Sequence, residues 1–125
     1  MTALLLDTHV VLWWILGSPR VRGAWVEAIT DPGNTVGVSA ASIWEIEIKK
    51  RRGKLHFDHD LLAVAADYGF VSVPISAQDA QRAGSLDWDH RDPFDRMLAA
   101  QSIERRLTLV TDDAAVRSAP GVVAL

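Results

Sequence analysis

The chain contains no cysteine, no long apolar run and no excess of basic residues. Without cysteine it forms neither a disulfide nor a thiolate zinc site, and this composition fits a cytoplasmic protein. The N-terminal apolar runs Ala3–Leu6 and Val10–Leu16 are interrupted by Asp7-Thr8-His9, and no basic leader precedes them. We therefore expect no signal peptide, no membrane span and no membrane partner.

Two further absences limit the class of protein. The formal net charge is −3, so the chain lacks the overall basic character that attracts nucleic acid indiscriminately. A metal-dependent nuclease can still be acidic, because its site collects carboxylates whose charge the bound cations offset. No internal repeat, low-complexity tract or linker divides the sequence, so we expect a single domain over residues 1–125.

Short apolar runs alternate with helical patterns along the chain. The runs are apolar throughout, as is typical of parallel strands that are buried on both faces. We predict strands at Ala3–Leu6, Thr35–Val38, Phe70–Val73, Leu107–Val110 and, as a fifth, Val122–Ala124. We predict helices at Val10–Leu16, Arg20–Thr30, Ser39–Arg52, Leu61–Asp67, Ser76–Ala83 and Asp92–Arg106. This order predicts an α/β fold, with a mainly parallel sheet of four to five short strands covered by helices on both faces.

Acidic residues follow two of these strands and lie near the start of two of the helices. Asp7 directly follows the first predicted strand, and Asp112 and Asp113 follow the fourth. Glu45 lies in the second turn of the third predicted helix, and Asp95 lies in the first turn of the last one. Because the carboxyl ends of parallel strands share one edge of a sheet, we expect these acids at that edge. Clustered carboxylates repel each other, and a bound Mg²⁺ or Mn²⁺ relieves that repulsion.

Each acid also has a purely structural interpretation. Asp7, Asp95 and the acid after the fourth strand can cap a helix N-terminus or complement its dipole. The run Ser42-Ile43-Trp44-Glu45 fits a capping box, and Glu45 can also pair with Lys49 one turn later. These interpretations weaken only when all the acids are considered together.

Four segments, in order, carry a more specific pattern. They are Leu4-Leu5-Leu6-Asp7-Thr8-His9, Ser39-Ala40-Ala41-Ser42-Ile43-Trp44-Glu45-Ile46, Arg91-Asp92-Pro93-Phe94-Asp95-Arg96-Met97-Leu98-Ala99-Ala100-Gln101 and Leu109-Val110-Thr111-Asp112-Asp113. Over essentially the whole chain they resemble the PIN-domain ribonucleases, and within them the VapC-type toxins of bacterial toxin–antitoxin pairs. The resemblance implies a three-layer α/β/α PIN-like domain.

The resemblance also implies an activity and its residues. It implies a divalent-metal phosphodiesterase acting on RNA, with Asp7, Glu45, Asp95 and Asp113 as the catalytic acids. Asp113 is selected by the family's Thr-x-Asp pattern, and Asp112 is an extra neighbouring carboxylate. Mg²⁺ or Mn²⁺ would be held by Asp7, Asp95 and Asp113, with Glu45 as a ligand or as a base that orients water. A homodimer and a cognate antitoxin that covers the site are implied as well.

Several polar residues near these acids have two interpretations. Thr8 and Thr111 are expected to orient metal ligands or to contact the substrate. Arg96 either contacts a phosphate or is a surface arginine of its helix. The basic run Lys49–Lys54 either complements a helix C-terminus or contacts the RNA backbone. The four histidines show no metal-ligand spacing, and we expect each to be exposed or structural.

Two rival functions remain open at this point. Asp7-Thr8-His9 after an apolar strand also suits an aspartyl-phosphate nucleophile, although His9 stands where such enzymes place a second acid. No glycine-rich phosphate loop follows any strand, which argues against phosphotransfer. The other rival is a PIN-like module that binds RNA or protein without catalysis, and the complete set of acids argues against it. RNA cleavage with Mg²⁺ or Mn²⁺, compared with EDTA, separates these alternatives.

Overall fold

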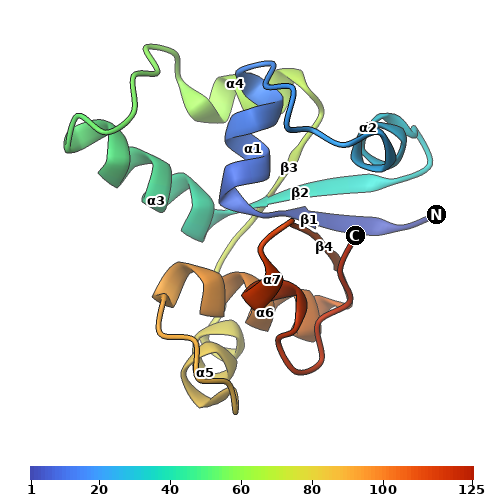
Figure 1. Cartoon of the computed structure of the whole chain (residues 1–125), viewed down its shortest axis with the longest axis vertical. Helices are drawn as coiled ribbons and strands as arrows, with labels where there is room; N and C mark the ends of the chain where they lie inside the picture. Colours follow the sequence, from blue (N-terminus) through green and yellow to red (C-terminus); the bar gives the residue numbers. More distant parts are fainter.

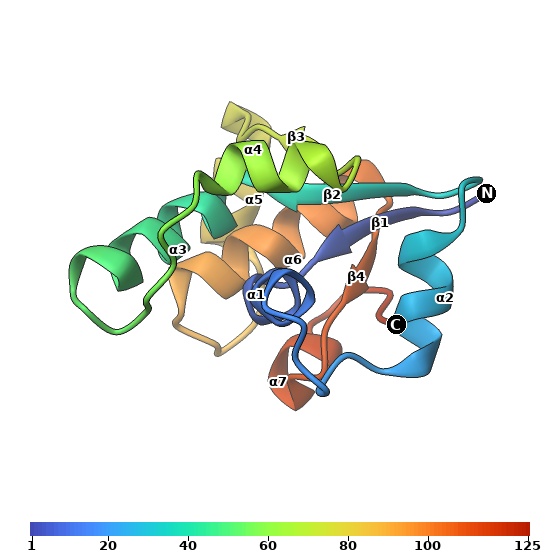
Figure 2. The ribbon, with the colours of Figure 1, turned by 90° about the horizontal axis from the view of Figure 1, so that it is seen from above.

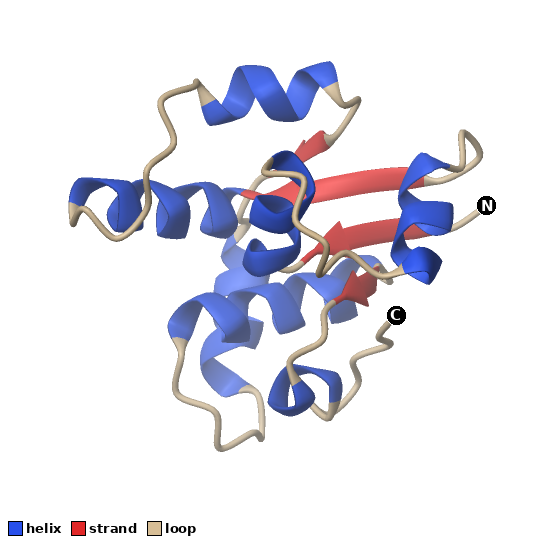
Figure 3. Ribbon diagram, turned by 45° about the horizontal axis from the view of Figure 1, so that its top comes forward, coloured by secondary structure: helices blue, strands red, loops and turns tan.

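The computed structural model describes all residues from 1 to 125, and its centre is a four-stranded sheet (Figures 1 and 3). The strand order is β3-β2-β1-β4, and every pairing is parallel. This confirms the predicted parallel α/β fold. The strands are β1 (Ala3–Leu6), β2 (Thr35–Ser39), β3 (Val71–Val73) and β4 (Thr108–Val110).

Helices cover both faces of the sheet and complete three layers. In Figure 1, α1, α2, α3 and α4 lie above the strands, and α5, α6 and α7 lie below them. None of these helices is long and apolar enough to span a membrane. The helices are α1 (Thr8–Ile15), α2 (Gly23–Thr30), α3 (Ala40–Arg51), α4 (Leu61–Asp67), α5 (Ala77–Ser85), α6 (Pro93–Arg105) and α7 (Ala114–Arg117).

The central strand β1 divides the core in two because its side chains alternate between the faces of the sheet. Leu4 and Leu6 belong to the larger apolar cluster, which includes the buried side chains of α1 and α2. Leu5 belongs to the smaller cluster, together with Leu98 of α6 and Val116 of α7. All three leucines are almost fully buried, which explains why β1 is apolar throughout.

Gly37 in β2 marks a close approach of two strands. A Cβ atom at this position would lie 2.8 Å from Val73 Cγ2 of β3 and 3.2 Å from the Leu4 carbonyl oxygen. The first distance is shorter than side chains tolerate, so β2 and β3 pack closely around a position without a side chain.

Three features differ from the prediction. Val122–Ala124 does not form a full fifth strand: it has a single parallel bridge to β4, from Ala124 to Leu109, with hydrogen bonds of Val123 and Leu125 beside it. The second helix begins at Gly23 and not at Arg20, since Ser18 accepts the Arg20 amide and holds these residues in a turn. The fold also contains the short helix α7 after β4.

Candidate active site

Asp7 lies at the carboxyl end of β1 and is buried among polar partners. Its amide donates to the Val110 carbonyl oxygen at 3.0 Å, which continues the parallel pairing of β1 with β4. Its Oδ1 atom accepts the His9 amide at 3.2 Å and thereby caps α1. Its Oδ2 atom accepts the Thr111 hydroxyl at 2.6 Å. The capping interpretation of Asp7 is therefore correct, and it leaves open a second role for this buried carboxylate.

Thr111 connects Asp7 to the acids that follow β4. The same hydroxyl that donates to Asp7 accepts the Asp113 amide at 3.1 Å. Thr111 is completely buried, so it orients Asp7 as expected but is not placed to contact a substrate. The substrate-contact prediction for Thr8 meets the same objection, because Thr8 is buried and its hydroxyl pairs with the Ser42 hydroxyl at 2.9 Å.

The Thr8–Ser42 bond also corrects the predicted capping box of α3. The N-cap is Ser39, whose hydroxyl accepts the Ala41 amide at 3.0 Å. Ser42 instead lies inside the helix and fastens its first turn to the start of α1. Glu45 is thus not a capping partner, which removes one of its two structural interpretations.

Glu45 lies on α3 close to the start of α6. The neighbouring ring of Trp44 meets the ring of Phe94 edge-on, with 5.2 Å between the centroids. Because Phe94 precedes Asp95, this contact joins the turn that carries Glu45 to the turn that carries Asp95. Glu45 Oε2 also lies 3.6 Å from Lys49 Nζ, so the predicted pair one turn apart is present.

Asp95 occupies the first turn of α6, as predicted. The turn is capped by Asp92, whose Oδ1 atom accepts the amides of Phe94 and Asp95 at 2.8 and 3.1 Å. The Asp95 carboxylate is mostly buried, and its Oδ2 atom lies 2.6 Å from His90 Nε2 in a hydrogen bond.

The environment of Asp95 disfavours its charge. Burial is the main cause that raises the pKa of Asp95 to about 6; the negative charges of Asp92 and Asp7 also raise it, and the His90 hydrogen bond lowers it. The charge of Asp7, at the end of β1, is therefore near enough to act on Asp95 at the start of α6.

Of the two acids after β4, Asp113 is joined to the site and Asp112 points outward. Asp113 Oδ1 caps α7 by accepting the amides of Ala115 and Val116 at 2.9 and 3.2 Å. Asp112 is exposed, and its Oδ2 atom lies 4.0 Å from Arg22 Nη2. Thr111 is bonded to the backbone amide of Asp113 and not to its carboxylate, so the choice of Asp113 as the fourth acid stays a prediction from the Thr-x-Asp pattern.

The residues present suit a divalent cation in type, although they do not enclose one. No three Asp, Glu or His side chains lie close enough together to hold an ion between them. The expectation that four acids converge on one point is therefore not met in this arrangement. Mg²⁺ commonly keeps several waters and takes only one or two carboxylates. The repulsion between Asp7 and Asp95 is the feature that a cation at this edge would relieve.

Arg96 is neither a surface arginine nor free for a phosphate. Its guanidinium donates to four carbonyl oxygens, those of Ala83, Leu86, Trp88 and His90, at 2.6 to 2.9 Å. Both interpretations made from the sequence are thus wrong, and the side chain holds the segment between α5 and α6 in place.

His90 is the site residue that the sequence did not reveal. Its ring stacks on Trp88, with 4.6 Å between the centroids and 18° between the planes, and it reaches Asp95 from outside the helix. The spacing of five residues has no regular-structure signature, so no pattern in the sequence predicts this contact. The other three histidines are exposed, as expected.

Comparison with known proteins agrees with this geometry. Residues 4–122 match the PIN domain family. Ribonuclease VapC22 of Mycobacterium tuberculosis is 30% identical over 121 residues, which cover 94% of this chain and 92% of that protein.

Two solved structures share the fold along nearly the whole chain. One is VapBC2 from Rickettsia felis bound to a DNA fragment from its promoter, with a TM-score of 0.73 and 17% identity over 99% of this chain and 98% of that one. The other is DNA-bound VapBC from Salmonella typhimurium, with a TM-score of 0.71 and 19% identity over 100% and 98%. Since the family match leaves out only three residues at each end, the chain belongs to the PIN domain family.

Proposed function

We propose that this protein is a divalent-metal-dependent ribonuclease that acts as the toxin of a toxin–antitoxin pair. The observation that carries the proposal is the meeting of the buried Asp7 with the mostly buried Asp95, whose pKa the charge of Asp7 helps to raise. Asp113 joins this pair through Thr111, and Glu45 lies on the helix turn next to Asp95. The likeness to a ribonuclease over 94% of the chain supports the choice of RNA as substrate.

Each acid of the site and Thr111 has a proposed role. Asp7 and Asp95 would hold Mg²⁺ or Mn²⁺ directly and Asp113 would hold it through a bound water, since Mg²⁺ commonly keeps several waters. When bound, such a cation supplies positive charge that stabilises the phosphate during attack by water. Thr111 fixes the direction of the Asp7 carboxylate through its 2.6 Å hydrogen bond. Glu45 keeps one carboxylate oxygen without a partner and is placed to orient a water or to add a ligand.

RNA cleavage by the purified protein tests this function. We expect cleavage with Mg²⁺ or Mn²⁺ and none with EDTA. The Asp95→Asn variant keeps a side-chain oxygen but loses the charge, so it should cleave at least about a hundredfold more slowly. The control is Asp60→Asn, which changes the exposed cap of α4 and should cleave normally. RNA binding by the wild type without any cleavage would instead identify a non-catalytic PIN module.

An antitoxin is the proposed partner, and an apolar groove between α3, α4 and β3 suits it. The groove has a volume of about 310 Å³ and is lined by Ile43, Trp44, Leu62, Val73 and Pro74. Trp44 is 63% exposed although it adjoins Phe94 at the start of α6. A solved structure with the same fold is a toxin–antitoxin complex from Klebsiella pneumoniae, which supports a partner of this kind.

We infer that an antitoxin arginine competes with the cation. Guanidinium groups pair with carboxylates in a bidentate way, so an arginine of the partner would occupy the carboxylate oxygens of Asp7 or Asp95 in place of the cation. Inhibition should then weaken as Mg²⁺ or Mn²⁺ is added to the purified complex, and inhibition indifferent to metal would exclude this competition. The homodimer and the cytoplasmic location stay predictions. Measuring the molecular mass in solution tests the first, and cell fractionation tests the second.

A further inference from the structure

Aromatic and basic side chains form a strip that starts at Asp7 and leads away along α1. His9 is two residues after Asp7 in the chain, and its Nδ1 atom lies 3.9 Å from Asp7 Oδ1. Its side chain is 58% exposed, so it stands at the rim of the acids and not among them. Trp13 lies one turn further along the same face of α1, with 5.9 Å between the two ring centroids.

The strip continues onto α2 through a stacked pair of tryptophans. Trp13 and Trp25 are nearly parallel, at 13°, with centroids 6.3 Å apart. Trp25 is buried, and its indole N–H donates to the Leu125 carbonyl oxygen at 3.1 Å, so the base of the stack is fixed. Figure 2 shows the C-terminus beside α2, in agreement with this contact.

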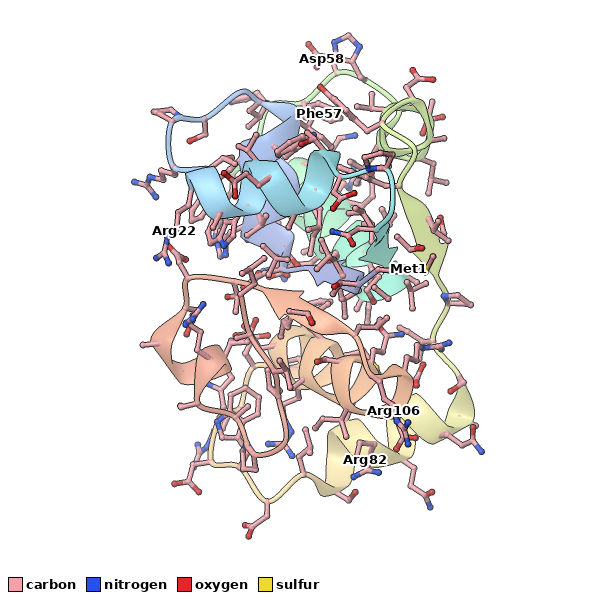
Figure 4. The ribbon with its side chains drawn as sticks, turned by 90° about the vertical axis from the view of Figure 1, so that its right-hand side faces the viewer. Met1, Arg22, Phe57, Asp58, Arg82 and Arg106 are labelled. Atoms are coloured by element: carbon pink, nitrogen blue, oxygen red, sulfur yellow. The ribbon has the colours of Figure 1, made fainter.

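Two arginines from the connection between α1 and α2 lie over these rings. Arg20 Cζ is 5.5 Å from the centre of the Trp13 ring, and Arg22 Cζ is 5.0 Å from the centre of the Trp25 ring. Both arginines are exposed, and Figure 4 shows Arg22 at the edge of the molecule between α2 and the α7 segment. Guanidinium groups held on aromatic faces are already ordered, so they lose little freedom when they bind an anion.

The strip also returns to the proposed site at its far end. Arg22 Nη2 lies 4.0 Å from the exposed carboxylate of Asp112, which is next to Asp113 in the chain. The strip therefore borders the acids on two sides, at Asp7 through His9 and at Asp113 through Asp112.

A polyanionic substrate such as RNA needs a cationic surface near the acids, because the acids themselves repel its phosphates. The acids repel phosphate, and the chain as a whole carries a net charge of −3. Many of the basic side chains are already engaged: Lys49 and Lys50 pair with glutamates of α3, and Arg96 binds backbone carbonyls. Arg20 has no carboxylate partner, and it lies on the strip that borders the acids.

We propose that His9, Trp13, Arg20 and Arg22 form a binding strip for single-stranded RNA beside the proposed catalytic acids. A base would stack on the exposed ring of His9 next to Trp13, and Arg20 and Arg22, held over the Trp13 and Trp25 rings, would contact the backbone phosphates. Aromatic stacking combined with cationic side chains is how proteins hold unpaired nucleotides. The proposal rests on the proposed ribonuclease function, because it assigns the path by which the substrate reaches that site.

Binding of a fluorescently labelled single-stranded oligoribonucleotide tests the strip. The measurement uses the Asp95→Asn background with Mg²⁺, so that the RNA stays intact. We expect the Arg20→Ala, Arg22→Ala double variant to bind RNA at least about tenfold more weakly. The slope of log affinity against log salt should fall by about 1.4, since each lost phosphate contact on a single strand removes about 0.7.

The matched control is the Arg51→Ala, Arg52→Ala double variant. It removes the same charge from the end of α3, which Figure 2 shows projecting away from the sheet. Its RNA affinity should change by less than about threefold. The control also tests the basic run at Lys49–Lys54 as the alternative RNA surface, and an equal or larger loss there would overturn the proposal.

Two further measurements keep the test decisive. If the double variant does not fold, the single variant Arg20→Gln removes one exposed charge and leaves the backbone bond to Ser18 intact. In the cleaving protein, strip variants should raise KM and leave kcat nearly unchanged, as expected when binding alone is lost. If folded strip variants bind RNA normally, the strip does not bind RNA, and its contacts only stabilise the connection between α1 and α2. A wild-type protein that neither binds nor cleaves RNA would refute the ribonuclease proposal itself.

Discussion

Asp95→Asn should make the metal-free protein more stable at neutral pH, although it removes a proposed catalytic acid. The folded protein raises the pKa of Asp95 from 3.8 to about 6, chiefly by burial. A raised pKa means that the folded state binds this proton more tightly than the unfolded state does. The stability contributed by the protonated form is therefore complete below about pH 4 and is lost as the pH rises through about 6.

The size of the effect follows from the shift. About two pKa units correspond to about 3 kcal/mol of unfolding free energy. The Asp95 side chain remains 20% exposed, so we expect about 1–3 kcal/mol after solvent screening. Asparagine is neutral throughout, so the variant avoids this loss above about pH 6 and has no advantage at about pH 4.

Urea unfolding in EDTA, followed by tryptophan fluorescence from about pH 4 to about pH 8, measures this difference. The two proteins should diverge between about pH 4 and about pH 6 and keep a constant difference at higher pH, with the variant the more stable. Mg²⁺ should then stabilise the wild type more than the variant, since only the wild type gains a relieved carboxylate. The exposed cap variant Asp60→Asn controls for amide substitution at a helix N-terminus and should stay within about 0.5 kcal/mol of the wild type at every pH. Parallel pH curves for wild type and Asp95→Asn would refute the argument that burial opposes the charge of Asp95.

Three other substitutions test the contacts around the site and the sheet. Thr111→Val removes the hydroxyl bound to Asp7, so unfolding free energy should fall by about 1–3 kcal/mol and RNA cleavage should drop more than about tenfold. His90→Ala frees the Asp95 carboxylate, so calorimetry should show Mn²⁺ affinity about tenfold weaker or more. Gly37→Ala forces a methyl group against the neighbouring strand, so urea unfolding should show a loss of about 1–3 kcal/mol.

Each of these has a control of the same chemical kind. Thr35→Val changes an exposed strand residue, and His56→Ala changes an exposed histidine, so neither should alter cleavage or metal affinity. Gly84→Ala adds a methyl group to α5 where no atom lies within 4 Å, so it should stabilise the protein by about 0.5–1 kcal/mol. Equal effects in a variant and its control would show that the contact named for that variant is not the cause.

The sheet could be predicted because its strands are short apolar runs with a buried partner on either side. Leu4, Leu5 and Leu6 leave no polar face, and this feature alone indicates a parallel sheet between two helical layers. Val122–Ala124 has a similar composition but forms only one bridge to β4, because the hydrogen bonds of Val123 and Leu125 span too few residues to make a ladder. The apolar composition of a segment indicates that it is buried, but it does not indicate how many backbone hydrogen bonds the segment makes with a neighbouring strand.

The candidate site could be predicted in its positions but not in its contacts. Topology alone brings Asp7 to the edge where β4 ends, and the cap signature of Asp92 and Pro93 places Asp95 in the first turn of α6. The roles of His90 and Arg96 depend on the path of an irregular segment. That path is set by tertiary contacts, which leave no period in the sequence to read.

Because Arg96 binds four carbonyl groups, this one side chain fixes the path of the connection between α5 and α6. The segment Leu86–Asp92 belongs to no helix or strand, and three of its carbonyl groups accept from this guanidinium. Lysine has no planar fork of donors, so even this mild exchange would leave carbonyls unpaired and release His90 from its place beside Asp95. A genetic selection for variants that are not toxic to the cell should therefore yield substitutions at Arg96 as well as at the acids. An observer without the structure would count it among the groups that touch RNA, when its whole influence passes through the backbone.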